Sequence, residues 1–545
     1  MYYQECERLA TEQTSLRPLI ADIDQKLHSL GPSAVLRADE FAAIIKQPAD
    51  KVAGVFQELT RLGLLREERH AECPLCGTLN DLAEYRKAVS DGDGFECSAC
   101  DRDIARRNAK EVVVHRLNAH AVEQVKRQNG GAPSTTIPLE RPALVEELPQ
   151  RIIDDPFRYT PLMHYYSQDA VLVKAWPLAG RRVVFVLHFL LDLVPFVEAC
   201  KRLGLEMQNA YFFYKEYPYP QREGIAALLR QRGATVQPRG QMGAWLKQLA
   251  DGPKERVGEL LFVEDGGFLV PSVHGQFKFL LPSVRGAVEQ TSRGAWNDDE
   301  VVGGLRVPVL SVAQCKLKNS FEPPYIAEAS VSNIKRMLPN LNLRGLPSAV
   351  FGYGAISGTI ADWLRTSGSI VTVYDKDPKA RLAATQHGHM TADSPVDAVR
   401  GKGLVVGASG NRSIDSTVIA ALSHNTYVVS ASSEQYEIDV EELEQQQKRR
   451  VPLVDDTGRP VGTSYSLPSG NRTIHLVANG YPVNFWGSES MPEQAADLIM
   501  SLILLSLVEV AQGSYAKPGL DSDAVNEIAD KYKLAEKFLE FHNAR

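Results

Sequence analysis

The sequence predicts an α/β protein in which a large two-domain core follows smaller N-terminal modules. Apolar runs of strand length alternate with helix-forming segments through the second half and much of the middle of the chain. One stretch, from Ser348 to Pro378, reads as strand, glycine-rich turn, helix and strand. Two CxxC pairs stand ahead of this region. With 545 residues, the chain has room for roughly three or four domains.

Composition narrows the environment and the partners. The net charge of −7 gives no overall basic field that would attract nucleic acid or an anionic membrane. The first residues, MYYQEC, lack the pattern of a secretory signal, and the seven cysteines suit a reducing compartment, so we expect a cytoplasmic protein. The apolar segment from Leu498 to Val508 is expected to be a buried helix, too short to cross a bilayer, and a candidate surface for a homodimer.

Residues 1–70 are predicted to form a helical domain that resembles a winged helix. Helices are expected up to about residue 30, around Phe41 and from Val52 to Leu62, followed by an extended wing that starts at Leu64. A DNA-reading helix usually carries several basic or amide side chains, whereas Asp50 to Leu62 also carries acidic ones. This balance favours a protein partner or a dimerisation module, with nucleic acid as the alternative.

Residues 71–127 are predicted to hold a zinc ribbon and a following helix. Cys73, Cys76, Cys97 and Cys100 form two CxxC pairs, and four thiolates at this spacing complete a closed tetrahedral site, so the zinc would be structural. The basic residues that follow are expected on a helix, as a solvated face or a contact for an acidic partner: Arg102, Arg106, Arg107 and Lys110.

Residues 128–139 are polar and rich in glycine and proline, and are predicted to be a linker. The segment 140–335 then reads as an α/β domain. Strands are expected at Val183 to Leu187 and Leu260 to Val263, with helices at Phe196 to Leu203 and Glu223 to Arg232. Asp265 therefore stands at the carboxyl end of a strand, where α/β proteins build their sites.

Residues 336–512 are predicted to be a Rossmann domain, followed by C-terminal helices over 513–545. Gly352 allows the tight turn, Gly354 lets the backbone approach a pyrophosphate, and Ser357 is small enough for helix and strand to come close. Asp375 is placed to accept hydrogen bonds from both ribose hydroxyls and would repel a 2′-phosphate, which favours NAD over NADP. A βαβ unit that binds nothing is the alternative.

From His188 to Leu534 the chain resembles S-adenosylhomocysteine hydrolase in both domains and in order. The motifs that carry the resemblance are EDGG from Glu264, LPSVRG from Leu281, EQTS from Glu289, GYG from Gly352, EIDV from Glu437, and LVANGYPVN from Leu476. The resemblance implies a bound NAD that oxidises the 3′-hydroxyl of a nucleoside, removal of the acidified C4′ proton, loss of homocysteine, addition of water and return of the hydride. The N-terminal 130 residues are not part of that plan.

The resemblance also implies roles for individual residues. If the protein is active, the groups near the ribose are His188, Asp265 and Lys318, with Glu322 in place of the family's aspartate. The residues implied at the cofactor, besides the glycine motif and Asp375, are Asn411, Asn484, Thr291 and Ser292. Several positions depart from the family: Gln290 replaces a glutamate, Pro323 an asparagine, Ala327 a cysteine and Ser433 a histidine.

Because these departures fall on proton transfer and ribose fixation, three hypotheses follow, in this order. The first is an NAD-binding homologue with impaired catalysis that recognises a nucleoside or dinucleotide and regulates through its N-terminal modules. The second is an active hydrolase on S-adenosylhomocysteine or a related adenosine thioether. The third is a scaffold that binds protein, or nucleic acid, through the winged helix and zinc ribbon. A homo-oligomer is expected, and no membrane partner.

Overall fold

The computed structural model describes most of the chain in two compact units. The described residues are 1, 3–28, 35–74, 79–91, 94–97, 104, 109–118, 148–215, 217, 219–252, 257–432, 436–446, 449–467 and 472–542. One unit contains the described residues up to 118, and the other those from 148 onward. The predicted linker 128–139 lies outside the described residues.

The first unit combines helices with a three-stranded antiparallel sheet in the order β2-β1-β3. Its elements are α1 (Gln4–Glu12), α2 (Arg17–His28), α3 (Ala38–Ile44), α4 (Ala49–Arg61), β1 (Leu65–Glu72), β2 (Leu79–Asp81), α5 (Leu82–Asp91) and β3 (Lys110–Leu117). Helix α4 buries Val52, Val55, Phe56 and Leu59, the face that its helical spacing predicts. The predicted helices and extended segment are present, while the winged-helix interpretation stays a prediction.

The prediction that Lys110 lies on a helix is wrong. Lys110 begins strand β3, which pairs along its whole length with β1, from Leu117 opposite Leu65 to Lys110 opposite Glu72. The β-branched run after Glu111 buries Val112 and Val114 and exposes Val113, the period-two alternation of a strand. Arg102, Arg106 and Arg107 lie outside the described residues. The three-stranded sheet therefore contains residues on both sides of the domain boundary that the sequence predicted at residue 70.

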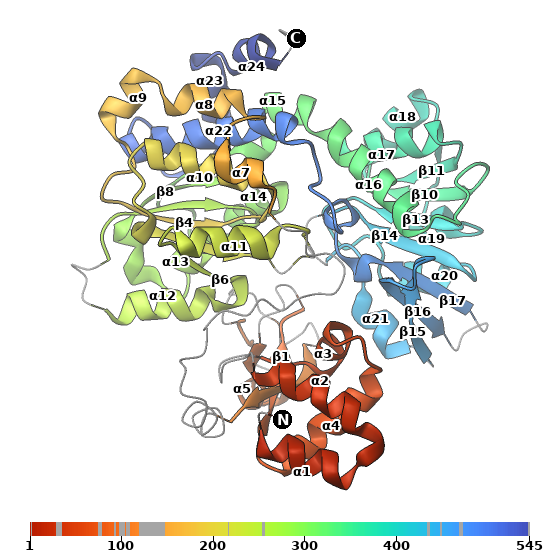
Figure 1. Ribbon diagram of the computed structural model, residues 1–545. Coiled ribbons are helices and arrows are strands. Elements are labelled where there is room, and N and C mark those ends of the chain that lie inside the picture. The colour runs from red at the N-terminus through yellow and green to blue at the C-terminus, as the bar shows by residue number, and fades with distance from the viewer. Residues whose placement is uncertain are drawn as a thin grey trace. The chain divides into compact units, whose positions relative to one another are not determined.

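The second unit contains a seven-stranded parallel sheet in the order β18-β9-β8-β7-β4-β5-β6 (Figure 1). Its strands are β4 (Arg182–Val186), β5 (Ala210–Tyr214), β6 (Thr235–Pro238), β7 (Leu260–Glu264), β8 (Val284–Glu289), β9 (Pro308–Ser311) and β18 (Gly519–Asp521). The helices are α7 (Gln150–Asp154), α8 (Pro161–Ser167), α9 (Ala170–Ala175), α10 (Leu193–Arg202), α11 (Arg222–Gln231), α12 (Met242–Asp251), α13 (Leu269–His274), α14 (Ser292–Asp299) and α15 (Lys316–Phe321).

Both faces of this sheet are covered. Helices α10 and α11 bury one face around Phe185 and Phe212, and α12 and α13 bury the other around Phe213 and Phe262. Burial on both sides explains why the strands read as continuous apolar runs and not as alternating ones. The predicted strands and helices of this region lie within a few residues of the observed ones.

The same unit holds an eight-stranded sheet in the order β12-β11-β10-β13-β14-β17-β16-β15. Its elements are α16 (Pro323–Met337), β10 (Pro347–Phe351), α17 (Ala355–Thr366), β11 (Ile370–Tyr374), α18 (Pro378–Gln386), β12 (Met390–Thr391), α19 (Pro395–Val399), β13 (Leu404–Gly407), α20 (Ser416–Ala421), β14 (Thr426–Ser430), α21 (Val440–Gln446), β15 (Arg449–Val454), β16 (Pro460–Leu467) and β17 (Arg472–Val477). The first six strands in that order are parallel and follow the Rossmann arrangement, as predicted.

The long apolar helix differs from its prediction in length and location. Helix α22 (Glu493–Gln512) has 20 residues and is long and apolar enough to cross a membrane, so the expectation of a short helix was wrong. However, 94% of the most apolar 18-residue stretch of α22 is buried inside the protein. This stretch lies in the core of the seven-stranded sheet and not in the Rossmann core. Residues Ala495 to Ala511 are all buried, which leaves no open face for the predicted dimer contact.

The chain after α22 adds one strand to the seven-stranded sheet and two helices beside α22. Strand β18 joins the edge of the seven-stranded sheet beside β9, and α23 (Asp523–Lys531) and α24 (Leu534–His542) pack near α22. Asp497, fully buried in α22, accepts hydrogen bonds from the amides of Leu162 and Met163 at 2.8 and 2.9 Å, and His542 Nε2 lies 2.9 Å from the same carboxylate. One side chain therefore fastens the start of α8 and the end of α24 to α22.

We expect Asp497→Ala to destabilise the protein by about 2–4 kcal/mol, because it leaves two buried amides of α8 without acceptors. Urea denaturation followed by circular dichroism measures this change. Ser501→Ala on the same helix is the matched control, since the buried Ser501 hydroxyl has no partner among the described residues and its loss should be nearly neutral. Equal effects of the two substitutions would contradict the role assigned to Asp497.

Candidate functional site

A cavity of about 630 Å³ lies where the carboxyl ends of the parallel strands of the two sheets meet. Several of its lining residues come one or two positions after a strand: His188 after β4, Asp265 after β7, Gln290 after β8, Gly352 after β10, Asp375 after β11 and Ser409 after β13. In parallel α/β sheets ligands bind at these ends, because the loops there are free to vary while the strands hold them in place. The cavity is therefore the candidate site.

The glycine-rich turn has the geometry that a dinucleotide needs. Gly352 has φ +96°, and a Cβ atom there would lie 2.9 Å from the Ala408 carbonyl oxygen, so only glycine fits. A Cβ at Gly354 would have only Ser357 Oγ within 4 Å, which leaves open space above the start of α17. Helix α17 begins at Ala355 and presents its first amides there. The turn fits a pyrophosphate.

Asp375 and Ser357 brace this turn from both sides. The Asp375 carboxylate accepts hydrogen bonds from the amides of Tyr353 and Asp377, each at 2.8 Å, and the side chain lines the cavity. Ser357 Oγ accepts from the Gly354 amide at 2.8 Å. A carboxylate has about four lone-pair positions, so Asp375 keeps acceptor capacity for a ribose. Gly352, Gly354, Ser357 and Asp375 thus all line the cavity, and their cofactor roles stay a prediction.

The next turn of the Rossmann sheet is organised by the buried carboxylate of Glu437. It accepts hydrogen bonds from the Ser409 amide and hydroxyl and from the Gly410 amide, and the hydroxyls of Ser413 and Ser432 also donate to it. Burial raises the pKa of Glu437. Ser409 and Gly410 line the cavity, whereas Asn411, predicted to lie beside the cofactor, is not among the lining residues.

Asn484 stands at the cavity with one polar atom unused. Its side chain is buried, and its Nδ2 donates to Ser490 Oγ at 2.9 Å, but Oδ1 has no hydrogen-bond partner among the described residues. Asn333 fixes the backbone here by donating to the carbonyl oxygens of Val483 and Asn484. An unpaired buried amide oxygen is costly unless a ligand donates to it, and the cofactor role of Asn484 stays a prediction.

On the other wall, Asp265 is held by three donors. Lys215 Nζ and Gln290 Nε2 make short hydrogen bonds to its two carboxylate oxygens, and His188 Nε2 lies 3.0 Å from Oδ2. Burial alone would raise the pKa of the Asp265 carboxyl, but His188 and Lys215 outweigh burial and hold this pKa well below its ordinary value. Asp265 is therefore a permanent carboxylate whose charge is balanced by buried Lys215.

His188 is enclosed by aromatic rings. Its ring stacks on Phe485, with centroids 4.2 Å apart, and its Nδ1 makes a short hydrogen bond with the Tyr219 hydroxyl. Tyr217 lies 5.5 Å from the same ring. Both ring nitrogens of His188 are thus engaged, one by Tyr219 and one by Asp265, so the imidazole is fixed in position at the cavity wall.

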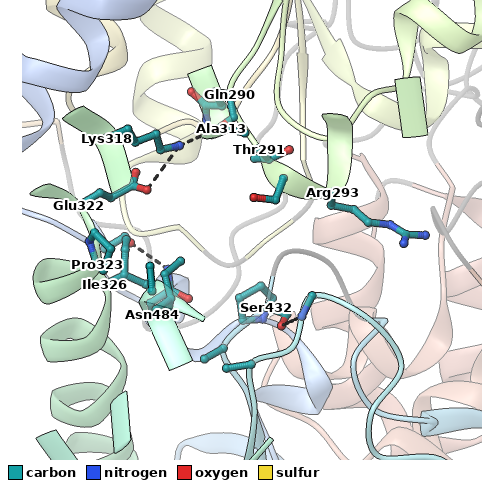
Figure 2. A pocket seen from close by; sticks show the side chains of 18 of the residues that line it. Gln290, Thr291, Arg293, Ala313, Lys318, Glu322, Pro323, Ile326, Ser432 and Asn484 are labelled. Atoms are coloured by element: carbon teal, nitrogen blue, oxygen red, sulfur yellow. Dashed lines mark hydrogen bonds and ion pairs between the residues drawn. The ribbon is translucent and has the colours of Figure 1, made fainter. Parts of the chain in front are cut away.

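Lys318 and Glu322 form the next polar pair along this wall (Figure 2). They lie one turn apart, Lys318 Nζ is 3.4 Å from Glu322 Oε2, and Nζ also donates to the Gln290 carbonyl oxygen at 2.6 Å. Thr291 and Ser292 line the cavity beside them, and the Thr291 hydroxyl caps α14 by accepting from the Gly294 amide at 3.0 Å. The cavity thus brings together the predicted residues of both groups except Asn411.

Behind this wall lies a cluster of buried carboxyl groups. Glu289 accepts hydrogen bonds from the amides of Gly266, Gly267 and Thr291 at 3.1, 2.9 and 2.7 Å. Oxygen atoms of Glu264, Glu289 and Asp298 lie within 4.8 Å of one another. Burial, reinforced by the charges of Glu264 and Asp265, raises the pKa of Glu289 to about 8. Glu289 therefore shapes the Asp265 turn from behind without entering the cavity.

The sequence did not single out Lys215, Phe485 or Trp296. Lys215 directly follows the aromatic strand β5, so its place at a strand's carboxyl end was a usable signal. Phe485 is adjacent to Asn484 in the chain, but nothing local to it indicates that it stacks on His188. Trp296 of α14 lines the cavity, and a Cβ at Gly410 would lie 3.1 Å from its ring. Both contacts join segments that are distant in sequence.

In the N-terminal unit, two of the four predicted zinc ligands are described. Cys73 and Cys97 are buried, and Asn80 Nδ2 lies 3.6 Å from Cys97 Sγ. Cys76 and Cys100 lie outside the described residues. One buried cysteine from each CxxC pair fits a closed thiolate site, but the zinc site stays a prediction.

Comparison with known proteins places this site in a class. The family model described as "S-adenosyl-L-homocysteine hydrolase, NAD binding domain" matches residues 325–490, which begin in α16 and end before α22. Residues 325–490 are thus an NAD-binding domain of the Rossmann type, as predicted. The domain ends where the chain returns to the seven-stranded sheet.

Relatives extend the similarity beyond that domain. Adenosylhomocysteinase from Thermotoga maritima is 27% identical over 69% of this chain and 92% of its own length. S-inosyl-L-homocysteine hydrolase from Methanopyrus kandleri is 28% identical over 63% and 80%, and adenosylhomocysteinase from Sulfurisphaera tokodaii is 27% identical over 61% and 78%. The domain match and these relatives, at low identity over most of the chain, support the resemblance to the adenosylhomocysteinase family that the motifs predict.

The raised pKa of Glu289 makes stability depend on pH. An unfolded glutamate has a pKa near 4.3, so between about pH 4.3 and 8 the folded state holds a proton that the unfolded state releases. Stability should fall as pH rises through this window, by up to about 1.4 kcal/mol per pH unit. In Glu289→Gln, which mimics the protonated group, we expect the melting temperature to change less between pH 6 and 8.

The exposed Glu328 on α16 provides the control. Glu328→Gln should leave the pH dependence of melting as in the unaltered protein. Parallel curves for Glu289→Gln and the unaltered protein would show that Glu289 does not hold the proton.

Proposed function

We propose that this protein binds NAD and an adenosine-type nucleoside in one cleft, carries out little or no hydrolysis, and uses ligand binding to regulate a partner of its N-terminal unit. The observation that carries the proposal is the state of Asp265. Its carboxylate is neutralised by buried Lys215 and held by the Gln290 amide, in a cavity that keeps the groups expected for a dinucleotide.

The cofactor half of the cleft supports binding. Gly352, the start of α17 and Asp375 offer a tight turn, free amides and a ribose acceptor, and the unpaired Asn484 Oδ1 offers an acceptor to a bound group. When bound, NAD would supply a hydride acceptor. Asp375 favours NAD over NADP, because a second negative charge beside its carboxylate would be repelled.

The opposite half supports recognition better than proton transfer. A general base must be free to take a proton and needs a pKa near the working pH. Asp265 has a strongly lowered pKa and three donors, Gln290 is an amide, and the Lys318 ammonium is paired with the Glu322 carboxylate. These groups can hold the hydroxyls of a ribose by donating and accepting hydrogen bonds.

An active hydrolase on an adenosine thioether is the second candidate. The pairs His188 with Asp265 and Lys318 with Glu322 both face the cavity, and each joins a potential acid to a potential base. If a bound ligand separated one of these pairs, the released group could move a proton. This candidate differs from the first in a single observable, which is the release of homocysteine.

The N-terminal unit supports a regulatory or scaffolding role. The face of α4 carries Asp50, Lys51, Glu58 and Arg61, and Arg61 is paired with Glu58 at 2.8 Å. A helix with mixed, internally paired charges suits a protein partner better than a phosphate backbone. We extend the proposal to a structural zinc ion held by Cys73, Cys76, Cys97 and Cys100 in this unit.

The function is tested on the purified full chain. We expect mass spectrometry of the denatured protein to find NAD, with or without adenosine, and we expect no free thiol to appear when the protein is incubated with S-adenosylhomocysteine. Release of homocysteine in repeated turnovers would replace the first candidate by the second. Absence of NAD, with no rise in melting temperature when NAD is added, would leave only the scaffold role.

A pair of glycine substitutions tests whether the bound NAD occupies the predicted turn. Gly352→Ala should lose NAD because its Cβ would clash with the Ala408 carbonyl group. Gly401→Ala is the matched control in the Rossmann domain. Gly401 also has a positive φ of +68°, but no atom lies within 4 Å of the added Cβ. Loss of NAD from both variants would indicate general strain and not a cofactor site at Gly352.

The zinc proposal predicts about one zinc ion per chain in elemental analysis, with loss of the metal in Cys73→Ser. Because structural zinc contributes directly to folding, a chelator should lower the melting temperature of the N-terminal unit. Cys315→Ser, at a cysteine outside the motif, should keep its zinc. A chain that contains no zinc after expression in zinc-supplemented medium would contradict the site.

A further inference from the structure

Among the described residues, the cavity wall contains one cation without a carboxylate partner. Three basic side chains line the cavity, and two are paired, His188 with Asp265 and Lys318 with Glu322. Arg293, the third, has no carboxylate within ion-pair distance among the residues that the structure describes. Figure 2 shows it on the opposite side of the cavity from the Lys318–Glu322 pair. Arg293 is only partly buried, so water hydrates part of its side chain.

Arg293 is held in place by an aromatic ring and not by a charge. Its guanidinium lies over the ring of Tyr436, 4.6 Å from the centroid. Arg412 lies 5.3 Å from the same ring, but its charge is balanced by Asp439 at 3.1 Å. Stacking uses the flat face of a guanidinium and leaves its N–H donors pointing outward from the edge. Arg293 is therefore a fixed cation with donors to spare.

Arg293 also bridges the two sheets. It belongs to α14 of the seven-stranded sheet, whereas Tyr436 follows the Rossmann strand β14. Trp296 of the same helix approaches Gly410 of the Rossmann turn. That turn has no amide to offer a phosphate from Ser409 or Gly410, because both donate to Glu437. Arg293 and the first amides of α17 are thus two sources of donors for an anion here, and Figure 2 shows the Arg293 side chain extending away from the Lys318–Glu322 pair.

We infer that Arg293 binds the phosphate groups of the dinucleotide from the wall opposite the glycine turn. The inference rests on the proposed binding of NAD and adds a second, charged half to the phosphate site. A pyrophosphate would be held by uncharged amides at α17 and by one guanidinium of α14, so the cofactor would connect the two sheets. The guanidinium is suited to this contact because its planar donors match phosphate oxygens in pairs.

Equilibrium titration of the ligand-free full chain tests the inference with three probes. NAD and ADP-ribose carry the pyrophosphate, and adenosine does not. In Arg293→Gln, which keeps a polar side chain near Tyr436 without the charge, the affinities for NAD and ADP-ribose should fall about 10- to 100-fold while that for adenosine is unchanged. Added salt should weaken NAD binding more in the unaltered protein than in Arg293→Gln.

Arg412→Ala is the matched control, because Arg412 lies on the same ring, is paired with Asp439 and is not among the cavity-lining residues. It should keep its affinity for NAD within about threefold. Equal NAD affinity for Arg293→Gln and the unaltered protein would overturn the inference and leave the proposed function standing. An equal loss of adenosine affinity would also overturn it, and an unaltered protein that binds no NAD would remove both.

Discussion

Buried carboxyl groups that accept hydrogen bonds from backbone amides are the constraint on which the site depends. Glu289 gathers the amides of Gly266, Gly267 and Thr291, and Glu437 gathers those of Ser409 and Gly410. Each joins loops that leave neighbouring strands of one sheet. Amides in tight turns at the end of a parallel sheet have no ladder partner, and leaving them unpaired would cost about 1–3 kcal/mol each. The carboxylates remove that cost and fix the loops at the same time.

This arrangement separates the shape of the cavity from its chemistry. Glu289 and Glu437 position these loops from behind, although some side chains at the cavity, such as Asp375, also brace a turn. Gln290, for example, faces Asp265, while its neighbour Glu289 holds the turn. A change at the first position alters the charge of the wall, whereas a change at the second would disturb the backbone.

The sequence could predict what local pattern determines. The Rossmann turn, the strand ends that carry Asp265 and Asp375, and the buried face of α4 follow from spacing and periodicity, and the structure has them. The basic neighbours of Lys110 predict a helix, but the three consecutive valines that follow favour a strand, in which they alternate between the buried and the exposed face. The location of α22 could not be read from the sequence, since an apolar helix gives no sign of which sheet it covers. The contacts of Lys215 and Phe485 are long-range and equally invisible.

The two binding walls of the cleft are chemically unequal, and the inequality constrains what can bind. The Rossmann wall presents amides, a carboxylate at Asp375 and an Asn484 amide oxygen that has no partner among the described residues, whereas the opposite wall presents paired charges and Arg293. A ligand that satisfies both must carry hydroxyls at one end and anionic oxygens between the walls. Neutral nucleosides meet only the first requirement, because Arg293 would lose water without gaining an anion. A pyrophosphate-linked nucleotide meets both, which favours the dinucleotide as the ligand that holds the walls together.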